Sequence, residues 1–579
     1  MRYGGGKRRS LSLKPLFVLC VVVTGLGLLV LSLRPLDAPA SSTVPLSRAS
    51  SSEFNTFSNN GSRVESILAV RHVGERPCKT VEEMGEDFGG GVGKESLRVR
   101  RIIQNHFLAN GASRVRDLPP EQFCRHGFVL GKASEAGFGN EMYKVLTAAA
   151  LSIMLNRSLI ISQTRHIALK HNLCQIFFAL FCCVVLSSII NTLLLNCRGK
   201  YPFGDYISYS NFTFTVKEIK HLWRHKGCES KYGRKLVIRI DDFMKPVETN
   251  VICSNWKKWK QPIIWFHGTV DSVAAQFFLK NIHSQMRTAA LNLFSDPQVL
   301  GIRPNVFGEL MRVLIFPSED VEAAVNWVIG GGENPDISLH MRMLMNRSGR
   351  AVQAMLRCLK KVIRSQHLMS SRPKVVVVSD TPVVVKSIMY MSNISKFAEV
   401  LHFDYDKFRG SMFKGLRITD SRRRDWGTAP RWVAFVDFFL ASRAKYAAIS
   451  GAHHRVGTTY AQLIAALAAA YNLGDKSSSR FTFLSSFQSN LLIDGLKNQG
   501  GWGHVWNRYA GPLSCRNQGN QCAFTPVLPS AWWDGLWQSP IPRDINRLAS
   551  YGIKLSALGT VDENSLKKHW SKASFASSV

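Results

Sequence analysis

The sequence predicts an α/β protein in which two doubly wound parallel sheets follow an N-terminal membrane anchor and a stem. An apolar run ends abruptly in a histidine and an arginine at Asp336–Arg342, and a glycine-bearing turn at 137–140 lies between two shorter apolar runs. The third observation is an uncharged stretch from Pro15 to Leu33 behind a basic N-terminus. Because ligands of open parallel sheets bind at the carboxyl ends of the strands, we expect functional side chains where the apolar runs end.

The second half of the chain shows the clearer alternation of strands and helices. After the strand that ends at His340 and Arg342, residues 350–368 carry apolar side chains at helical spacing. Lys374–Asp380 is a second buried strand that ends on Ser379 and Asp380. Further elements are expected at 382–391 (helix), 398–403 (strand), 431–442 (helix), 446–450 (strand) and 457–471 (helix). A satisfied structural pair at a strand end would account for His340 and Arg342 equally well.

The composition of the 579-residue chain indicates a folded protein with an anionic partner. Hydrophobic residues make up 45% of it, and the formal net charge is +34. This length can hold two or three domains and bury large cores. Such a charge is typical of proteins that bind nucleic acid, a membrane surface or a phosphate-bearing small molecule.

The N-terminal region predicts a single-pass type II membrane protein. Basic residues precede the uncharged run, and this charge asymmetry places residues 1–15 in the cytoplasm. Residues 16–33 are long enough to cross an early-secretory bilayer as a helix, with a cleaved signal peptide as the competing interpretation. Residues 34–120 are expected to form a stem, because 36–62 is rich in Ser, Ala, Pro, Thr and Asn. We therefore expect the remainder in the Golgi lumen, where a nucleic-acid partner is not expected.

Glycosylation triplets and cysteines suit that location. An oxidising lumen permits disulfides, and Cys515 and Cys522 lie close enough in sequence to close a small loop. The partners of Cys78, Cys124, Cys228, Cys253 and Cys358 do not follow from the sequence. The asparagines in N-x-S/T triplets are Asn60, Asn156, Asn211, Asn346 and Asn393.

The first folded half, residues 121–330, opens with a strand–turn–helix–strand pattern. A strand at 128–130 is followed by the turn Gly137-Phe138-Gly139-Asn140, a helix over 141–155 and a strand at 159–161. Such a tight turn permits a ligand to approach the backbone closely. The third glycine of the dinucleotide fingerprint is missing, which argues against a nicotinamide site.

Two motifs resemble those of GDP-fucose-dependent fucosyltransferases, and the plant O-fucosyltransferase-like family is the most similar group. Gly137-Phe138-Gly139-Asn140-Glu141-Met142 resembles the turn that opens the first domain in that group, and His340-Met341-Arg342 resembles its donor-site strand end. The resemblance covers about residues 125–475. It implies two facing Rossmann-like domains, a GT-B-like arrangement, with the donor site in residues 331–475. It further implies an inverting transfer of fucose from GDP-fucose to a glycan or protein hydroxyl, without a metal.

The resemblance also implies which residues form the donor site. Arg342 and His340 would act on the donor diphosphate, and the helix start at Gly457, Thr458 and Thr459 would offer N–H groups and the positive end of its dipole. An ordinary N-cap would by itself explain either threonine. Glu135 and Glu141, which flank the glycine turn, are the candidates for the general base. The other residues expected at the donor are Gly137, Gly139, Asn140, Ser379, Asp380 and Ser450, with Asp437 on the preceding helix in a role that could be structural.

The chain departs from the group directly after the strand-end motif. Members often carry a further basic or glycine–acid pair there, whereas Met343-Leu344-Met345 follows here. An altered donor site is therefore one expectation.

A hydrophobic insertion at 166–198 interrupts the first domain. Residues 175–195 hold no charge and are long enough to span a membrane. Such a crossing would divide one sheet between two sides of a bilayer, whereas joining Arg165 to Gly199 gives a short connection. We expect a retained intron or an error in the gene model; a buried insertion or a second anchor is the alternative.

Other functions stay open at the level of sequence. Asp404-Tyr405-Asp406 is an Asp-x-Asp triplet, which predicts a divalent metal on the donor in a different glycosyltransferase architecture. The interrupted first domain and the Trp-rich tail at 476–579 would also suit an inactive membrane scaffold or receptor.

Overall fold

The structure is a computed structural model. The residues that it describes form two mainly parallel sheets with their covering helices. It describes residues 80–86, 92–133, 137–163, 203–233, 238–242, 255–267, 278–296, 303–343, 349–368, 372–382, 385–386, 393–408, 429–430, 432–450, 457–474, 481–487, 521–527, 549, 552–554 and 563–576. The anchor expected at 16–33 and the insertion at 166–198 lie outside these residues. None of the helices in the described residues is both long and apolar enough to cross a membrane.

The first sheet has five parallel strands in the order β4-β2-β1-β6-β5. Its central strand β1 aligns Phe128 with Ser158 of β2 and with Ile263 of β6. Strand bounds are β1 Phe128–Ala133, β2 Ser158–Gln163, β4 Phe214–Thr215, β5 Ile238–Asp242 and β6 Ile263–His267. The predicted strands at 128–130 and 159–161 are therefore present, each a few residues longer than expected.

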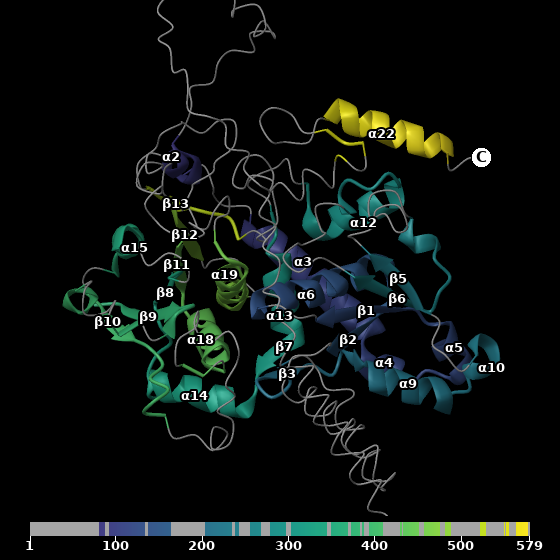
Figure 1. The fold of residues 1–579 in the computed structure, drawn as a ribbon, viewed down its shortest axis with the longest axis horizontal. Coiled ribbons are helices and arrows are strands. Elements are labelled where there is room, and N and C mark those ends of the chain that lie inside the picture. Colours follow the sequence, from purple (N-terminus) through teal and green to yellow (C-terminus); the bar gives the residue numbers. More distant parts are fainter. Residues whose placement is uncertain are drawn as a thin grey trace, which may run out of the picture. The chain divides into compact units, whose positions relative to one another are not determined.

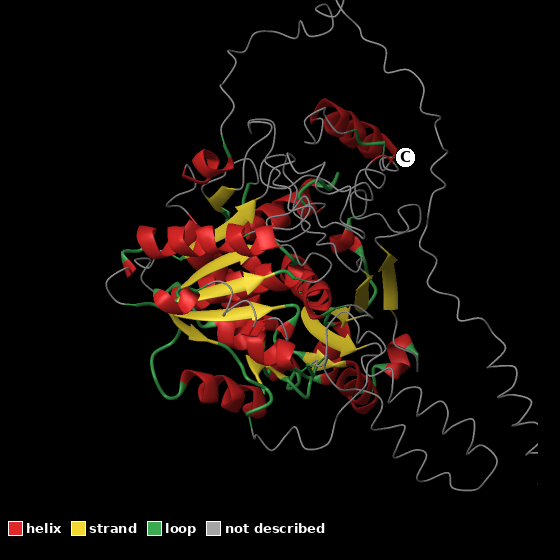
Figure 2. Cartoon of the chain, turned by 60° about the vertical axis from the view of Figure 1, so that its left-hand side comes forward, coloured by secondary structure: helices red, strands yellow, loops and turns green. Residues whose placement is uncertain are grey.

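Helices cover both faces of the first sheet (Figures 1 and 2). Val129 points into the core formed with α6 (Phe138–Leu155), α12 (Ser284–Phe294) and α13 (Val306–Leu314). Its neighbours Phe128 and Leu130 point to the opposite core, under α4 (Ala112–Val115), α5 (Pro120–Arg125) and α9 (Val216–His225). Successive side chains of a strand alternate between faces, so an apolar run buried on both sides is the expected pattern.

The second sheet has six strands in the order β10-β9-β8-β11-β12-β13, and all but the last pair are parallel. The chain runs from β8 outward to β10 and then returns to β11 on the other side of β8, so the order reverses between β8 and β11. Strand bounds are β8 Ile337–Met341, β9 Lys374–Ser379, β10 Glu399–Leu401, β11 Tyr446–Ser450, β12 Thr482–Phe487 and β13 Gln521–Phe524.

The two faces of the second sheet carry different helices. Ile337, Leu339 and Met341 of β8 pack against α15 (Gly349–Ser365). The other face packs on α18 (Val433–Ser442) through Val376 and Val378, and on α19 (Thr459–Asn472) through Ala447 and Ile449. His340 alternates with Leu339 and Met341 along β8, so it belongs to the face of α18 and α19.

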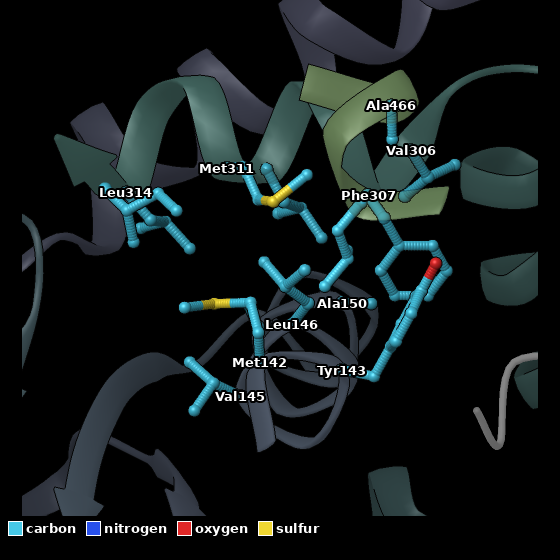
Figure 3. Packing of buried hydrophobic residues seen from close by; sticks show 14 of the residues in the cluster. Met142, Tyr143, Val145, Leu146, Ala150, Val306, Phe307, Met311, Leu314 and Ala466 are labelled. Atoms are coloured by element: carbon cyan, nitrogen blue, oxygen red, sulfur yellow. The ribbon is translucent and has the colours of Figure 1, made fainter. Parts of the chain in front are cut away.

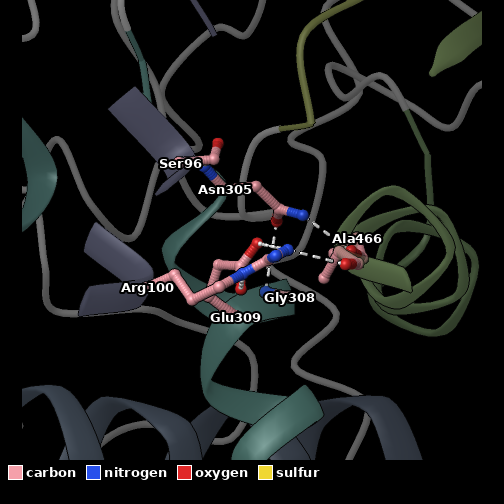
Figure 4. Close-up of polar contacts among 7 residues, drawn as sticks. Ser96, Arg100, Asn305, Gly308, Glu309 and Ala466 are labelled. Carbon is pink, nitrogen blue, oxygen red and sulfur yellow. Dashed lines mark hydrogen bonds and ion pairs between the residues drawn. The ribbon is translucent and has the colours of Figure 1, made fainter. Parts of the chain in front are cut away.

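Helices α6, α13 and α19 pack together between the sheets. Met142 and Leu146 of α6 meet Phe307 and Met311 of α13 in this core, with Ala466 of α19 beside them (Figure 3). A methyl group on Gly308 would lie 2.1 Å from the Ala466 carbonyl oxygen, so the glycine permits α13 and α19 to approach this closely. Asn305 caps α13 by accepting from the Gly308 N–H, and its amide donates to the same Ala466 carbonyl (Figure 4).

Part of the expected stem is folded. Helix α3 (Val92–Asn110) buries Val99, Ile103 and Phe107 in the main core, although the interval 34–120 was expected to be a stem. Its apolar side chains recur every four residues, which is the spacing of a packed helix face. The stem prediction is therefore wrong for residues 92–120.

The predicted Cys515–Cys522 disulfide is also wrong. Cys522 pairs with Cys358, and the second disulfide joins Cys124 to Cys228, with Cα separations of 5.2 and 5.3 Å. The reason is the antiparallel edge strand β13, which points Cys522 into the core beneath α15, where Cys358 lies. The tail beyond 475 thus contributes β12, β13 and a covalent link to the second sheet.

The remaining elements complete the two layers. Strands β3 (Ile207–Tyr209) and β7 (Ile315–Pro317) form a small antiparallel pair. Helix α14 (Glu319–Ile329) ends at Gly330 in the left-handed region, before β8. The other helical segments are α2 Val81–Glu86, α10 Glu229–Tyr232, η1 Trp256–Lys258, η4 Ile394–Lys396 and α22 Glu563–Ala576.

Candidate functional site

Strands β8, β9 and β11 end at one edge of the second sheet, and their terminal residues are joined by side-chain hydrogen bonds. The Arg342 backbone N–H donates to the Ser450 hydroxyl at 2.7 Å. The Met343 backbone N–H donates to Asp380 Oδ1, also at 2.7 Å. The Ser379 hydroxyl donates to the Met341 carbonyl at 2.9 Å. Polar groups predicted from three separate stretches are therefore one cluster, at the point where the strand order reverses.

Arg342 and Asp380 form an ion pair in this cluster. Arg342 Nη1 lies 2.6 Å from Asp380 Oδ2, and the two side chains are 20% and 13% exposed. Arg342 Nε is buried without a hydrogen bond. The carboxylate holds the guanidinium in one orientation, with a fifth of the side chain still exposed. A guanidinium suits bidentate binding of a phosphate oxygen pair.

His340 is buried behind the ion pair. Its ring lies 5.8 Å from that of Tyr460, and neither ring nitrogen makes a hydrogen bond. Burial lowers the pKa of His340 to about 4, with the nearby Asp380 carboxylate opposing the shift and Arg342 adding to it. The imidazole is therefore neutral at physiological pH, with one ring nitrogen as a hydrogen-bond donor and the other as an acceptor.

The start of α19 completes this side of the site. The Thr458 side chain accepts from the Ala461 N–H at 3.2 Å, so it serves as an N-cap. The cap uses the side-chain oxygen, and the positive end of the helix still points towards the edge where β11 ends. An added methyl on Gly457 would lie 2.3 Å from Ile449 Cδ1, so the end of that side chain would have to move.

The glycine turn of the first sheet meets α19 directly. A methyl group on Gly139 would lie 2.6 Å from the Tyr460 backbone nitrogen and 2.7 Å from Thr459 Oγ1. Phe138 packs edge-on against Phe438 and Tyr460. The glycine turn is thus in contact with the predicted helix start at 457–459, with Gly139 as the residue that permits it.

The other residues predicted from the glycine turn have different surroundings. Gly137 is exposed and Asn140 is partly buried in the first turn of α6. Glu141 is fully buried in α6, where an acceptor hydroxyl could not reach it without a rearrangement. Glu135 lies outside the described residues. The general base is therefore not placed by this arrangement.

Tyr460 and Asp437 are further buried groups beside His340. The Tyr460 hydroxyl donates to the Ala434 carbonyl at 2.6 Å. Burial raises its pKa well above the ordinary value, and the Asp437 and Asp380 carboxylates add to this. Burial likewise raises the pKa of Asp437 well above its ordinary value. Burial thus favours the protonated form of both groups, and the single Tyr460 hydroxyl proton is already donated to Ala434. The sequence did not predict Tyr460 as a site residue, although it directly follows the predicted helix start.

Lys132 was also missed. It stands near the carboxyl end of β1, where its ammonium lies 4.5 Å from the centre of the Trp265 ring, and burial lowers its pKa. A single lysine in a buried strand was the only available signal.

The Asp404–Asp406 triplet does not suit a metal. Asp404 lies 3.2 Å from Lys386 and 3.7 Å from Lys407, so two ammonium groups occupy the position a cation would need. Burial would raise the pKa of Asp404, but the hydrogen bond and charge of Lys386 lower it overall. In the part of the chain that the structure describes, no group of three His, Cys, Asp or Glu residues could hold a metal ion.

Three of the five glycosylation triplets lie in the described residues. Asn156, Asn211 and Asn393 are all exposed, whereas Asn60 and Asn346 lie outside. Exposure is required for a glycan, and attachment itself stays a prediction.

Fold and site together define an α/β protein with a polar cluster at the carboxyl ends of a doubly wound sheet. A family described as "Family of unknown function (DUF7810)" matches residues 73–576, and the chain belongs to this family. This is not the plant O-fucosyltransferase-like family expected from the motifs. No curated protein matches the chain.

Several solved structures show limited similarity. FUT1 of Arabidopsis thaliana, a variant in complex with GDP, is 9% identical over 63% of this chain and 71% of its own, with a TM-score of 0.34. The NodZ α-1,6-fucosyltransferase soaked with GDP-fucose is 11% identical over 63% and 96%, with a TM-score of 0.31. POFUT1 in complex with GDP-fucose is 10% identical over 62% and 98%, with a TM-score of 0.30. These scores are too low to establish a common fold.

Proposed function

We propose that the chain is a glycosyltransferase that moves fucose from GDP-fucose to a hydroxyl of a glycan or protein, with inversion at the sugar. The observation that carries the proposal is Arg342, held by Asp380 at the end of central strand β8, where the strand order reverses. Ligands of doubly wound sheets bind at this point. The glycine turn, one of the two motifs that resemble the fucosyltransferases, contacts the start of α19 through Gly139.

The residues suit the departure of a nucleoside diphosphate. As the sugar–oxygen bond breaks, negative charge grows on the β-phosphate, and fixed cations and N–H dipoles aimed at it lower the barrier. Arg342 would supply the cation, and the backbone N–H groups at the start of α19 the dipoles. The neutral His340 ring lies buried behind the ion pair and would add no charge to the site. These groups neutralise the leaving diphosphate without a metal.

The location is part of the proposal. Two disulfides in the described residues support folding in an oxidising compartment such as the secretory lumen. We propose a Golgi type II membrane protein with residues 16–33 as its anchor. Protease treatment of sealed microsomes should leave the chain beyond the anchor intact, whereas digestion from residue 199 onward would mean that 175–195 crosses the membrane.

Donor binding tests the function directly. Calorimetry on the full chain in detergent should detect GDP and GDP-fucose, and UDP-glucose should bind at least about tenfold more weakly. A radiolabelled donor with a panel of glycan and protein acceptors then reports transfer. Absence of any nucleotide binding by correctly folded protein would favour the scaffold or receptor instead.

A further inference from the structure

A cleft of about 560 Å³ lies on the face of the second sheet that α15 covers, away from the polar cluster at Arg342. Its walls come from α15, α2 and the edge strand β13, which lie next to one another in Figure 1. None of the donor-site residues contributes to it. The lining residues are Glu82, Ala354, Arg357, Lys361, Arg364, Ser365 and Cys522.

The cleft is held together by polar and covalent links. Lys361 Nζ lies 3.1 Å from the Cys522 carbonyl oxygen and 3.2 Å from Glu82 Oε1. The same Glu82 oxygen accepts from the Cys522 N–H at 3.3 Å, which fixes α2 to β13. The Cys358–Cys522 disulfide ties α15 to that strand. The walls are therefore positioned before any ligand arrives, which lowers the entropic cost of binding.

Two arginines in the cleft remain available for a ligand. Lys361 is neutralised by Glu82, whereas Arg357 and Arg364 are exposed and have no carboxylate partner within the described residues. They are seven residues apart on α15, so they lie on one face of the helix about 10 Å apart along its axis. Arginine binds carboxylate or sulfate through two parallel hydrogen bonds.

We propose that this cleft binds an acidic sugar chain, with Arg357 and Arg364 each holding one carboxylate or sulfate group. The axial spacing of Arg357 and Arg364 on α15 favours a chain with repeated acid groups over a single small anion. The cleft is concave, which favours such a chain over a flat lipid surface. The disulfides indicate an oxidising compartment, where nucleic acid is not expected as the partner. The assignment goes beyond the proposed function, because the cleft lies on the other side of the sheet from Arg342 and holds a second ligand.

The test measures binding of acidic sugars without any transfer. Full-length protein in detergent is titrated with an oligogalacturonate for carboxylates, a heparin-derived oligosaccharide for sulfates, and a neutral malto-oligosaccharide of equal length. The variant is R357A/R364A. The matched control is K360A/K396A, which removes the same charge from exposed residues outside the cleft. Vesicles containing phosphatidylserine test the lipid alternative.

At least one acidic chain should bind, and R357A/R364A should raise its Kd at least about tenfold while the control changes it less than about twofold. Which of the two acidic probes binds distinguishes carboxylate from sulfate. The proposal would be overturned if the wild type and R357A/R364A bound both acidic chains with equal affinity. It would also be overturned if the double substitution weakened binding to the vesicles and left binding to both acidic chains unchanged. GDP affinity is measured on the same proteins and should not change. Failure of GDP to bind the wild type would refute the transferase proposal separately, whatever the result with acidic chains.

Discussion

Gly139 is the residue where the first sheet's turn and the second sheet's helix α19 meet most closely. We expect Gly139→Ala to destabilise the chain by about 1–3 kcal/mol, because the added methyl would lie 2.6 Å from the Tyr460 backbone nitrogen. Donor binding should weaken as well, since the start of α19 would be displaced. Thermal unfolding and GDP titration measure the two effects.

Gly137 provides the matched control for that change. It lies two residues earlier in the same turn, yet a methyl group there would meet nothing within 4 Å, and its φ is −68°. Gly137→Ala should therefore leave Tm and GDP affinity nearly unchanged. Equal effects of the two substitutions would show that general stiffening of the turn, and not the contact with α19, decides the outcome.

His340 makes stability depend on pH. Burial lowers its pKa from 6.5 to about 4 in the folded chain, so between these values the unfolded chain binds more protons. Stability should therefore be full above about pH 6.5 and decrease as the pH falls towards 4, by about 3 kcal/mol for this residue. Buried His106 and half-buried His126 have pKa values lowered in the same way and add to the loss.

Denaturant unfolding between pH 7.5 and 4.5 checks this pH dependence. Replacing His340 with Gln should make the curve less steep, because one of the protons taken up on unfolding is removed. A slope unchanged by His340→Gln would contradict the placement of a neutral histidine in the buried site.

At the scale of elements, the buried pair Arg100–Glu309 fastens α3 to α13. Arg100 Nε lies 2.7 Å from Glu309 Oε2, and its Nη2 also donates to the Ala470 carbonyl of α19 at 2.9 Å (Figure 4). Glu309→Ala should cost about 3–5 kcal/mol, because it leaves a buried guanidinium without its partner. Removing the exposed pair of Arg224 with Glu229 by Arg224→Ala should cost less than about 1 kcal/mol. Similar losses in denaturant unfolding would contradict the role of the buried pair.

The elements that the sequence predicts best are the buried strands of the second sheet. Strand β11 has the predicted bounds, and β9 and α15 differ from prediction by a few residues, because continuous apolar runs and helical spacing are local signals. Strands β12 and β13 were missed. Their pairing joins segments separated by more than 30 residues, and no local pattern specifies which distant segment a short edge strand will join.

The candidate site was predictable only in its separate pieces. Arg342, Asp380 and Ser450 were expected because each follows an apolar run, and sheet order brings them together. The cysteine pairing failed for the opposite reason. Closeness in sequence favoured Cys515, whereas the direction in which β13 points Cys522 is fixed by long-range packing against α15.

At the scale of the whole molecule, residues 166–198 are expected to be dispensable. They lie between β2 and β3, outside the described residues, and lengthen a connection within one domain. A variant lacking 166–198 should fold with unchanged Tm and be exported more readily than the full chain, as secretion and thermal unfolding would show. Hydrogen-exchange protection across 175–195 in the full chain, with loss of stability on deletion, would instead make the segment part of the core.

The central claim is that Arg342 binds the diphosphate of the donor, and GDP affinity measured by calorimetry on Arg342 variants tests it. Arg342→Ala should weaken binding by about 1.5–3 kcal/mol, and Arg342→Lys should recover part of this, because an ammonium keeps the charge but loses the two-pronged contact. The exposed control Arg372→Ala should bind normally. The double variant R342A/D380N also removes the carboxylate charge that Arg342 balances, so it should regain stability while GDP binding stays weak. Normal GDP affinity in that folded double variant would show that Arg342 and Asp380 are a structural pair and would contradict the account.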